Sequence, residues 1–237
     1  MGYRNEDEME IKEKLAFTLA EVLITLGVIG VVAAITIPGL ITSYNKKITE
    51  TRLAKFYSVF NQAIRLSVAE NGDVDTWDDY WDNDGISTGG QENQTGVEKV
   101  FDTYLRPYMQ IAYKKRIHYE QDKILYVLQD GGAFAYNVWG TRDITFFPKD
   151  AEKCIARNKP IGTCSFMFIF YPISEAESWK YHYNKGIEPY LYDWDGSKTH
   201  LKSGATYSCA NSGYYCTAMI KNNGWKIPKD YPLKLQY

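Results

Sequence analysis

A single carboxylate, Glu21, lies within a long apolar run that extends from Phe17 to Ile41. No other residue of these 25 is charged. A helix of that length would span roughly 37 Å, which is enough to cross the hydrocarbon core of a bilayer. An ionised carboxylate inside such a span costs about 2.5–3.5 kcal/mol on insertion scales, so we expect some feature of the protein or its surroundings to compensate for it.

The four cysteines are the second informative set of side chains, and all lie in the C-terminal half. Nine residues separate Cys154 from Cys164 and six separate Cys209 from Cys216, which does not match the close pairs of structural zinc sites. Three pairings are possible, and these two local ones are favoured because each pair brackets turn-forming residues. Free thiols or a metal site are the alternatives. Disulfides would place this half in an oxidising compartment.

The sequence contains no recognisable enzyme motif. It has no Gly-x-Ser-x-Gly, no His-Glu-x-x-His and no glycine-rich phosphate loop. His182 lies in an aromatic cluster, which favours a structural or surface role.

Residues 82–85 (DNDG) superficially match a calcium loop, but Tyr80 and Gln91 would then occupy positions that require carboxylates. Residues 193–196 (DWDG) could bind calcium only with ligands from elsewhere, so we predict no enzyme, no cofactor and no metal site.

A long helix is expected to position Glu21. Its first half is the apolar run, and Pro38 should kink it or locally melt it because proline removes a backbone donor. Beyond Pro38, apolar residues recur at spacings of three and four, which predicts an amphipathic half that ends at Asn71 and Gly72. These apolar residues are Leu53, Phe56, Tyr57, Phe60, Ala63, Ile64 and Val68.

The remainder of the chain is typical of a mainly β-sheet head. Residues 124–128 and 133–139 flank an Asp-Gly-Gly turn and predict a hairpin. Residues 165–171 predict another strand, and residues 216–228 predict two strands joined by an Asn-Gly turn. A short helix is expected over residues 96–111. The predicted fold class is therefore α+β, with a long N-terminal helix packed on a C-terminal antiparallel β-sheet head that carries disulfide loops.

Three simple interpretations of the apolar run each leave something unexplained. A removable signal peptide has an apolar region about half as long, followed by a small-x-small cleavage site that is not evident here. A plain membrane anchor explains the length but not Glu21. A buried core helix would need protein on all sides, and the rest of the chain is too small and polar to provide it.

A fourth interpretation rests on the order of residues in the stretch KLAFTLAEVLITLG, residues 14–27. A small residue, Ala16, precedes Phe17-Thr18-Leu19-Ala20-Glu21 and the long apolar segment. This resembles the N-terminus of the type IV pilin and type II secretion pseudopilin superfamily, although most members have Gly where this sequence has Ala16. The resemblance is strong over residues 15–44, weaker to residue 71 and only general beyond it.

The resemblance implies that a prepilin peptidase cuts between Ala16 and Phe17 and that the new N-terminus of Phe17 is methylated. Glu21 would then meet the N-terminal amine of an adjacent subunit and fix the axial register. The alternative is that Glu21 neutralises its own amine or is protonated. The apolar face from Leu23 to Ile37 would pack between helices, and Pro38 would let the helix pack differently in the membrane and in the filament.

The implied organisation has four parts: a cleaved leader (1–16), a transmembrane and assembly helix (17–43), an amphipathic helix continuing into the head (44–71) and a globular α+β head (72–237). The subunit would lie in the bacterial inner membrane as a single-pass protein, with its head periplasmic or extracellular, before entering a pilus or pseudopilus. Its partners would be the peptidase, other pilin or pseudopilin subunits, the inner-membrane assembly platform and, before assembly, membrane lipid. A count of Lys and Arg around the span favours the opposite orientation, but the cysteines and the cleavage motif favour export.

A binding function is the rival hypothesis. The head is rich in Tyr and Trp and is large for a bulk subunit, so the chain could be a minor-pilin tip or an adhesin-like module that contacts surfaces, glycans or DNA. The net charge of −2 argues against nucleic-acid binding by bulk charge, while a local basic patch stays open.

Overall fold

The structure, a computed structural model, describes residues 18–77, 96–119, 121–137, 140–170 and 186–237. The chain forms two compact units, Met1–Thr42 and Ser43–Tyr237. Helix α1 (Leu19–Asn71) contributes residues to both units. We refer to the second unit as the head unit.

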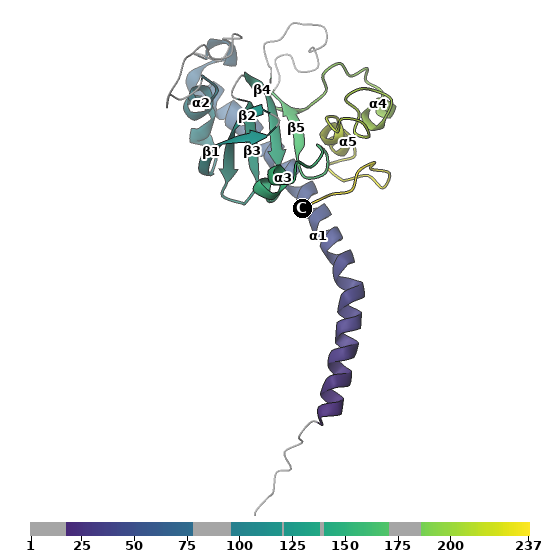
Figure 1. The fold of residues 1–237 in the computed structure, drawn as a ribbon. Helices are drawn as coiled ribbons and strands as arrows, with labels where there is room; N and C mark the ends of the chain where they lie inside the picture. Colours follow the sequence, from purple (N-terminus) through teal and green to yellow (C-terminus); the bar gives the residue numbers. More distant parts are fainter. Residues whose placement is uncertain (1–17, 78–95, 120, 138–139, 171–185) are drawn as a thin grey trace, which may run out of the picture. The chain divides into compact units, whose positions relative to one another are not determined.

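The head unit contains a six-stranded antiparallel sheet whose strands are neighbours in chain order (Figure 1). The strands are β1 (Ile111–Tyr119), β2 (Gln121–Leu128), β3 (Ala133–Asn137), β4 (Gly140–Phe147), β5 (Phe166–Ile169) and β6 (Glu188–Pro189). The predicted hairpin is confirmed, because Leu125 of β2 pairs with Ala135 of β3. Its turn contains Gly131 in the left-handed conformation (φ 81°), which glycine adopts without steric cost.

Short helical segments complete the head unit. They are η1 (Val74–Thr76), α2 (Gly96–Val100), η2 (Phe101–Leu105), η3 (Arg106–Tyr108), α3 (Ala151–Ala156), α4 (Lys198–Lys202) and α5 (Cys216–Asn222). The helix expected over residues 96–111 is present as α2, η2 and η3, and β1 begins at Ile111. The chain is therefore α+β, with a long apolar N-terminal helix, an antiparallel sheet and two disulfides, as the sequence predicts.

The second half of α1 packs on one face of the sheet. Phe56 is the centre of this contact, since its ring lies 4.2 Å from that of Phe146, 5.2 Å from that of Phe168 and 5.4 Å from that of Phe134, measured between centroids. The predicted amphipathic face is confirmed, with Tyr57 and Val68 partly buried at its margin. Its buried members are Leu53, Phe56, Phe60, Ala63 and Ile64. The helix ends at Asn71, and Gly72 follows with φ 81°, as predicted.

The opposite face of the sheet forms a smaller apolar cluster. Leu125, Ala135 and Phe147 contribute to it, together with the two cysteines of the first disulfide, Cys154 and Cys164. Alternation along β2 explains the two-sided burial, because successive residues of a strand point to opposite faces. Ile124 and Tyr126 accordingly belong to the cluster that contains α1.

The prediction of two strands over residues 216–228 is wrong. Residues Cys216–Asn222 form helix α5 instead. Cys216 and Ile220 are both fully buried, and their spacing of four residues places them on one helical face. The Asn-Gly pair ends this helix rather than forming a hairpin turn, since Gly224 follows the cap residue Asn223 with φ 68°.

Candidate functional site

The apolar part of α1, residues 19–42, exposes nearly all of its large side chains. The relative exposure of these residues ranges from 41% at Val22 to 78% at Leu19. They are Leu19, Val22, Leu23, Ile24, Leu26, Val28, Ile29, Val31, Val32, Ile35, Ile37, Leu40 and Ile41. At about 100° of rotation per residue, Val22, Leu23, Ile24 and Val32 point in four different directions around the axis, so the exposed apolar side chains cover every face of the helix. A helix that is apolar all round requires lipid or other helices as its surroundings.

Helix α1 is also long and apolar enough to cross a membrane, and no residue of its most apolar stretch is buried within the protein. This property is consistent with a membrane anchor.

Glu21 lies in the first turn of α1 and is bonded to Thr18. The Oε2 atom of Glu21 accepts hydrogen bonds from the backbone N–H and the Oγ1 hydroxyl of Thr18, both at 2.9 Å. The backbone N–H of Glu21 donates to Thr18 Oγ1 at 3.2 Å. This reciprocal arrangement is a capping box, which satisfies donors that the first turn of a helix otherwise leaves unpaired.

From the sequence, the expected partner of Glu21 is an N-terminal amine, and its role in a capping box is not predicted. The signal was present, because Thr18 and Glu21 have the Thr-x-x-Glu spacing immediately before an apolar run. Both hydrogen bonds of the carboxylate use Oε2, and Oε1 accepts no hydrogen bond from any residue that the structure describes. Glu21 therefore has a local structural role, and one of its oxygens is left for a further contact.

The hydroxyl groups of the apolar segment are satisfied within the helix. Thr25, Thr36 and Thr42 each donate to a backbone carbonyl three or four residues earlier, at 2.9–3.0 Å. Thr18 bonds to Glu21, so every Thr of residues 18–42 has an internal partner. An apolar environment offers no water to such groups, and this pattern removes the cost of placing them there.

The other predicted residues of the N-terminal segment have different outcomes. Ala16 and Phe17, the expected cleavage pair, lie outside the described residues. Pro38 lies inside α1, and the helix is continuous through it, so the local melting that we considered there does not occur. Proline has no backbone N–H, so the helix lacks one backbone hydrogen bond at Pro38. One turn later, the hydroxyl of Thr42 donates a hydrogen bond to the carbonyl of Pro38.

Both predicted disulfides are present. Cys154 in α3 is bonded to Cys164, which lies just before β5. Cys209 is bonded to Cys216 at the start of α5. The described residues contain no free cysteine.

Of the two Asp-rich loops weighed as calcium sites, only residues 193–196 lie in the described part of the chain. Residues 82–85 and His182 lie outside the described part of the chain. Asp195 instead accepts the backbone N–H of Ser197 at 2.9 Å and pairs with Nδ1 of His200 at 2.6 Å. Within the described ranges, no three His, Cys, Asp or Glu side chains are grouped so that they could hold a metal ion.

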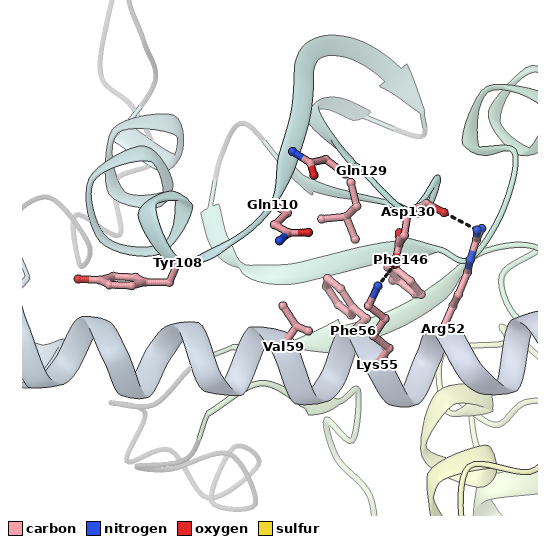
Figure 2. Close-up of a pocket in the computed structure, with 10 residues that line it drawn as sticks. Arg52, Lys55, Phe56, Val59, Tyr108, Gln110, Gln129, Asp130 and Phe146 are labelled. Carbon is pink, nitrogen blue, oxygen red and sulfur yellow. Dashed lines mark hydrogen bonds and ion pairs between the residues drawn. The ribbon is translucent and has the colours of Figure 1, made fainter.

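A groove of about 310 Å³ lies in the head unit between α1 and the end of the sheet that carries the β2–β3 turn (Figure 2). Its apolar lining comes from Phe56 and Val59 on the helix and from Leu128 and Phe146 on the sheet. Gln110 and Gln129 contribute amide groups on the sheet side. No local sequence pattern predicts this groove, because its lining residues come from segments far apart in the chain.

One end of the groove is charged. Lys55 Nζ lies 2.6 Å from Asp130 Oδ2, and the other carboxylate oxygen of Asp130 accepts the backbone N–H of Gly132 at 3.0 Å. The guanidinium of Arg52 donates to the backbone carbonyls of Asp130 and Pro148. Figure 2 shows Arg52 and Lys55 rising from the helix toward Asp130.

These features define a protein class by structure: an α+β head unit with an antiparallel sheet, joined to an apolar N-terminal helix. Residues 39–235 match the family of unknown function DUF6613, and the chain belongs to that family. The matched range contains the second half of α1, the sheet and both disulfides. Comparisons with curated proteins and with solved structures give no match.

Proposed function

We propose that this chain is a prepilin-like structural subunit that assembles through its N-terminal helix into a type IV pilus or a type II secretion pseudopilus. The observation that carries the proposal is the position of Glu21, the single charge in residues 18–42, where α1 is apolar on every face. A prepilin peptidase would cut between Ala16 and Phe17 and methylate the new N-terminus.

The capping box is compatible with this processing. Thr18 and Glu21 both follow the proposed cleavage site, so removal of residues 1–16 leaves the box intact. The new ammonium group of Phe17 would then need an anion in an apolar environment. Glu21 Oε1 would pair with such a cation, from its own chain or from an adjacent subunit, while Oε2 keeps its bonds to Thr18.

Helix packing would supply the rest of the assembly energy. The hydroxyl groups of residues 18–42 are already paired within the helix, so apolar side chains such as Leu23 and Ile35 form most of the surface offered to neighbours. Only the Glu21 carboxylate and the terminal amine would require polar partners. A subunit in the wrong axial register would leave one of these charges unpaired, which is costly in an apolar core.

The disulfides support an exported head. Cys154–Cys164 and Cys209–Cys216 are typical of an oxidising compartment. We therefore place the subunit in a bacterial inner membrane with its head periplasmic or extracellular, where it would meet the assembly platform and other subunits.

Intact mass and N-terminal sequencing of the mature protein test the proposal. We expect loss of residues 1–16 and one added methyl group on Phe17 when the chain is produced with a prepilin peptidase. An unprocessed mature chain would contradict the proposal and favour a plain membrane anchor. A catalytically inactive peptidase is the control, and it should leave the leader in place.

A minor-pilin tip or adhesin-like module is the second candidate. The observation that favours it is a cluster of partly buried aromatic side chains beside the Cys209–Cys216 loop, which includes Tyr192, Tyr207 and Tyr214. The rings of Tyr207 and Tyr214 lie 5.8 Å apart. Subunit stoichiometry in purified filaments separates the two roles, because a tip component would be present in very few copies.

A further inference from the structure

The groove between α1 and the sheet has features that the assembly proposal does not use. Its volume of about 310 Å³ falls at the lower end of the range for small-molecule sites, about 300–1,000 Å³. A ligand with one ring and a short polar arm matches that size.

The apolar lining favours a flat hydrocarbon group. Phe56 and Phe146 stack nearly parallel, with an angle of 11° between their planes, and both are almost fully buried. Val59 on the helix and Leu128 on the sheet complete this lining. Phe56 and Phe146 form the floor of the groove, and an aromatic ring that enters it would contact mainly the partly buried Val59 and Leu128. Burial of such a ring is favourable because it removes apolar surface from water.

The charged end of the groove has a net positive charge. Arg52 and Lys55 contribute two cations, whereas Asp130 contributes one anion whose two oxygens already have partners. The guanidinium group has five N–H donors, and two donate to backbone carbonyls. The ammonium group of Lys55 has three donors, and its side chain is 55% exposed. Donors and one unit of positive charge are therefore left for an anion.

We propose that this groove binds a small aromatic monocarboxylate. The ring lies against Val59 and Leu128, and the carboxylate accepts hydrogen bonds from Lys55 and Arg52. The planar fork of a guanidinium matches the geometry of a carboxylate, and the single excess charge matches a monoanion. Gln110 and Gln129 supply amide groups at the sheet side of the groove. This inference does not depend on the filament proposal, because it concerns the head unit alone.

Methyl NMR of the full chain in detergent micelles tests the proposal with phenylacetate as the probe. We expect saturable shifts of the Val59 and Leu128 methyl signals, with an affinity in the millimolar range for so small a ligand. The neutral isostere phenylacetamide should bind at least about fivefold more weakly, because it lacks the charge that Lys55 and Arg52 recognise. Empty micelles serve as the control for partitioning of the probe.

Two lysine variants locate the charge contact. Lys55→Gln should weaken phenylacetate binding by roughly three- to fivefold, the range of a partly exposed ion pair. Lys202→Gln is the matched control, since Lys202 is also partly exposed and pairs with a carboxylate, Asp230, at 2.8 Å. It should leave the affinity unchanged.

Three results would overturn the proposal. They are the absence of saturable Val59 and Leu128 shifts, equal affinities for phenylacetate and phenylacetamide, and unchanged affinity in a folded Lys55→Gln variant. The comparison of the acid with its amide uses the wild-type chain, so it decides the question even if a variant does not fold.

Discussion

The carboxylate of Glu50 accepts the backbone N–H of Ile227 at 3.0 Å, across 177 positions of sequence. The side chain of Glu50 is only 7% exposed, and its second oxygen lies 3.3 Å from Nζ of Lys226. Two further contacts hold the same C-terminal segment, since Tyr231 donates to the carbonyl of Gly162 and Gln236 N–H donates to that of Thr163. The C-terminal segment is thus hydrogen-bonded both to α1 and to the loop before β5.

Glu50→Ala should destabilise the head unit by about 2–3 kcal/mol, because it leaves the buried N–H of Ile227 without an acceptor and removes a charged partner. Glu50→Gln keeps an acceptor and should lose less. The measurement is the denaturant concentration at the midpoint of unfolding, which reports stability when the m-value is the same in each variant. Glu152→Ala, which breaks an exposed pair with Lys115, is the control and should change the midpoint little. Equal losses in Glu50→Ala and Glu152→Ala would contradict this account.

Removal of either disulfide should lower the free energy of unfolding. The cysteines are separated by 10 and 7 positions, and loops of that size correspond to about 2–3 kcal/mol in the chain-entropy account. The check is the unfolding midpoint of a Cys154→Ala/Cys164→Ala variant and of a Cys209→Ala/Cys216→Ala variant. With both pairs replaced, reductant should no longer shift the midpoint. If reductant still shifts the midpoint of that four-site variant, the effect of reductant on the wild type cannot be assigned to the two disulfides.

The Lys55–Asp130 pair should make stability depend on pH. Burial raises the pKa of Asp130, but the Lys55 ammonium and the N–H of Gly132 together outweigh burial, so the pKa lies below its ordinary value of 3.8. A lowered folded-state pKa means that the pair stabilises the fold fully above about pH 4 and loses this contribution as pH falls through the folded-state pKa.

Asp130→Asn should therefore be less stable than the wild type at pH 6, and the difference should shrink below pH 4. Unfolding midpoints of the two proteins at pH 6, 4 and 3 provide the check. A difference that grows as pH falls would contradict the assigned direction of the pKa shift.

Local pattern was sufficient for some elements. The apolar runs on either side of the Asp-Gly-Gly turn predicted the β2–β3 hairpin, and the spacing of Leu53, Phe56 and Phe60 predicted the buried face of α1. The disulfide pairing was predictable because each bridge closes a short loop that carries its own turn residues.

Other elements depend on tertiary context that one sequence does not contain. Strand β1 was missed because Lys114, Lys115 and Arg116 obscure its alternation. As an edge strand it tolerates these charges, and Lys114 pairs with Asp102 of η2 at 2.6 Å. Helix α5 was mistaken for a strand because its Thr, Met and Ile residues suit either structure, and only burial of Cys216 with Ile220 distinguishes them.

The two roles assigned to Glu21, helix cap and charge for assembly, predict different results for paired substitutions. Gln can replace Glu in a capping box, so Glu21→Gln should preserve the start of α1 but lose the anion. Thr18→Val should have the opposite effect, since it removes the hydroxyl that bonds to Glu21 and keeps the charge. Thr18→Ser retains a hydroxyl and is its matched control.

If the charge sets the axial register, Glu21→Gln and Glu21→Ala should both insert into the membrane and both enter filaments far less than the wild type. Thr18→Val should then assemble nearly normally, because loss of one cap contact costs a helix only about 1 kcal/mol. The measurement is the fraction of each variant in sheared filaments relative to the membrane fraction. Normal incorporation of Glu21→Gln together with poor incorporation of Thr18→Val would instead assign Glu21 to capping alone, and the register argument would fail.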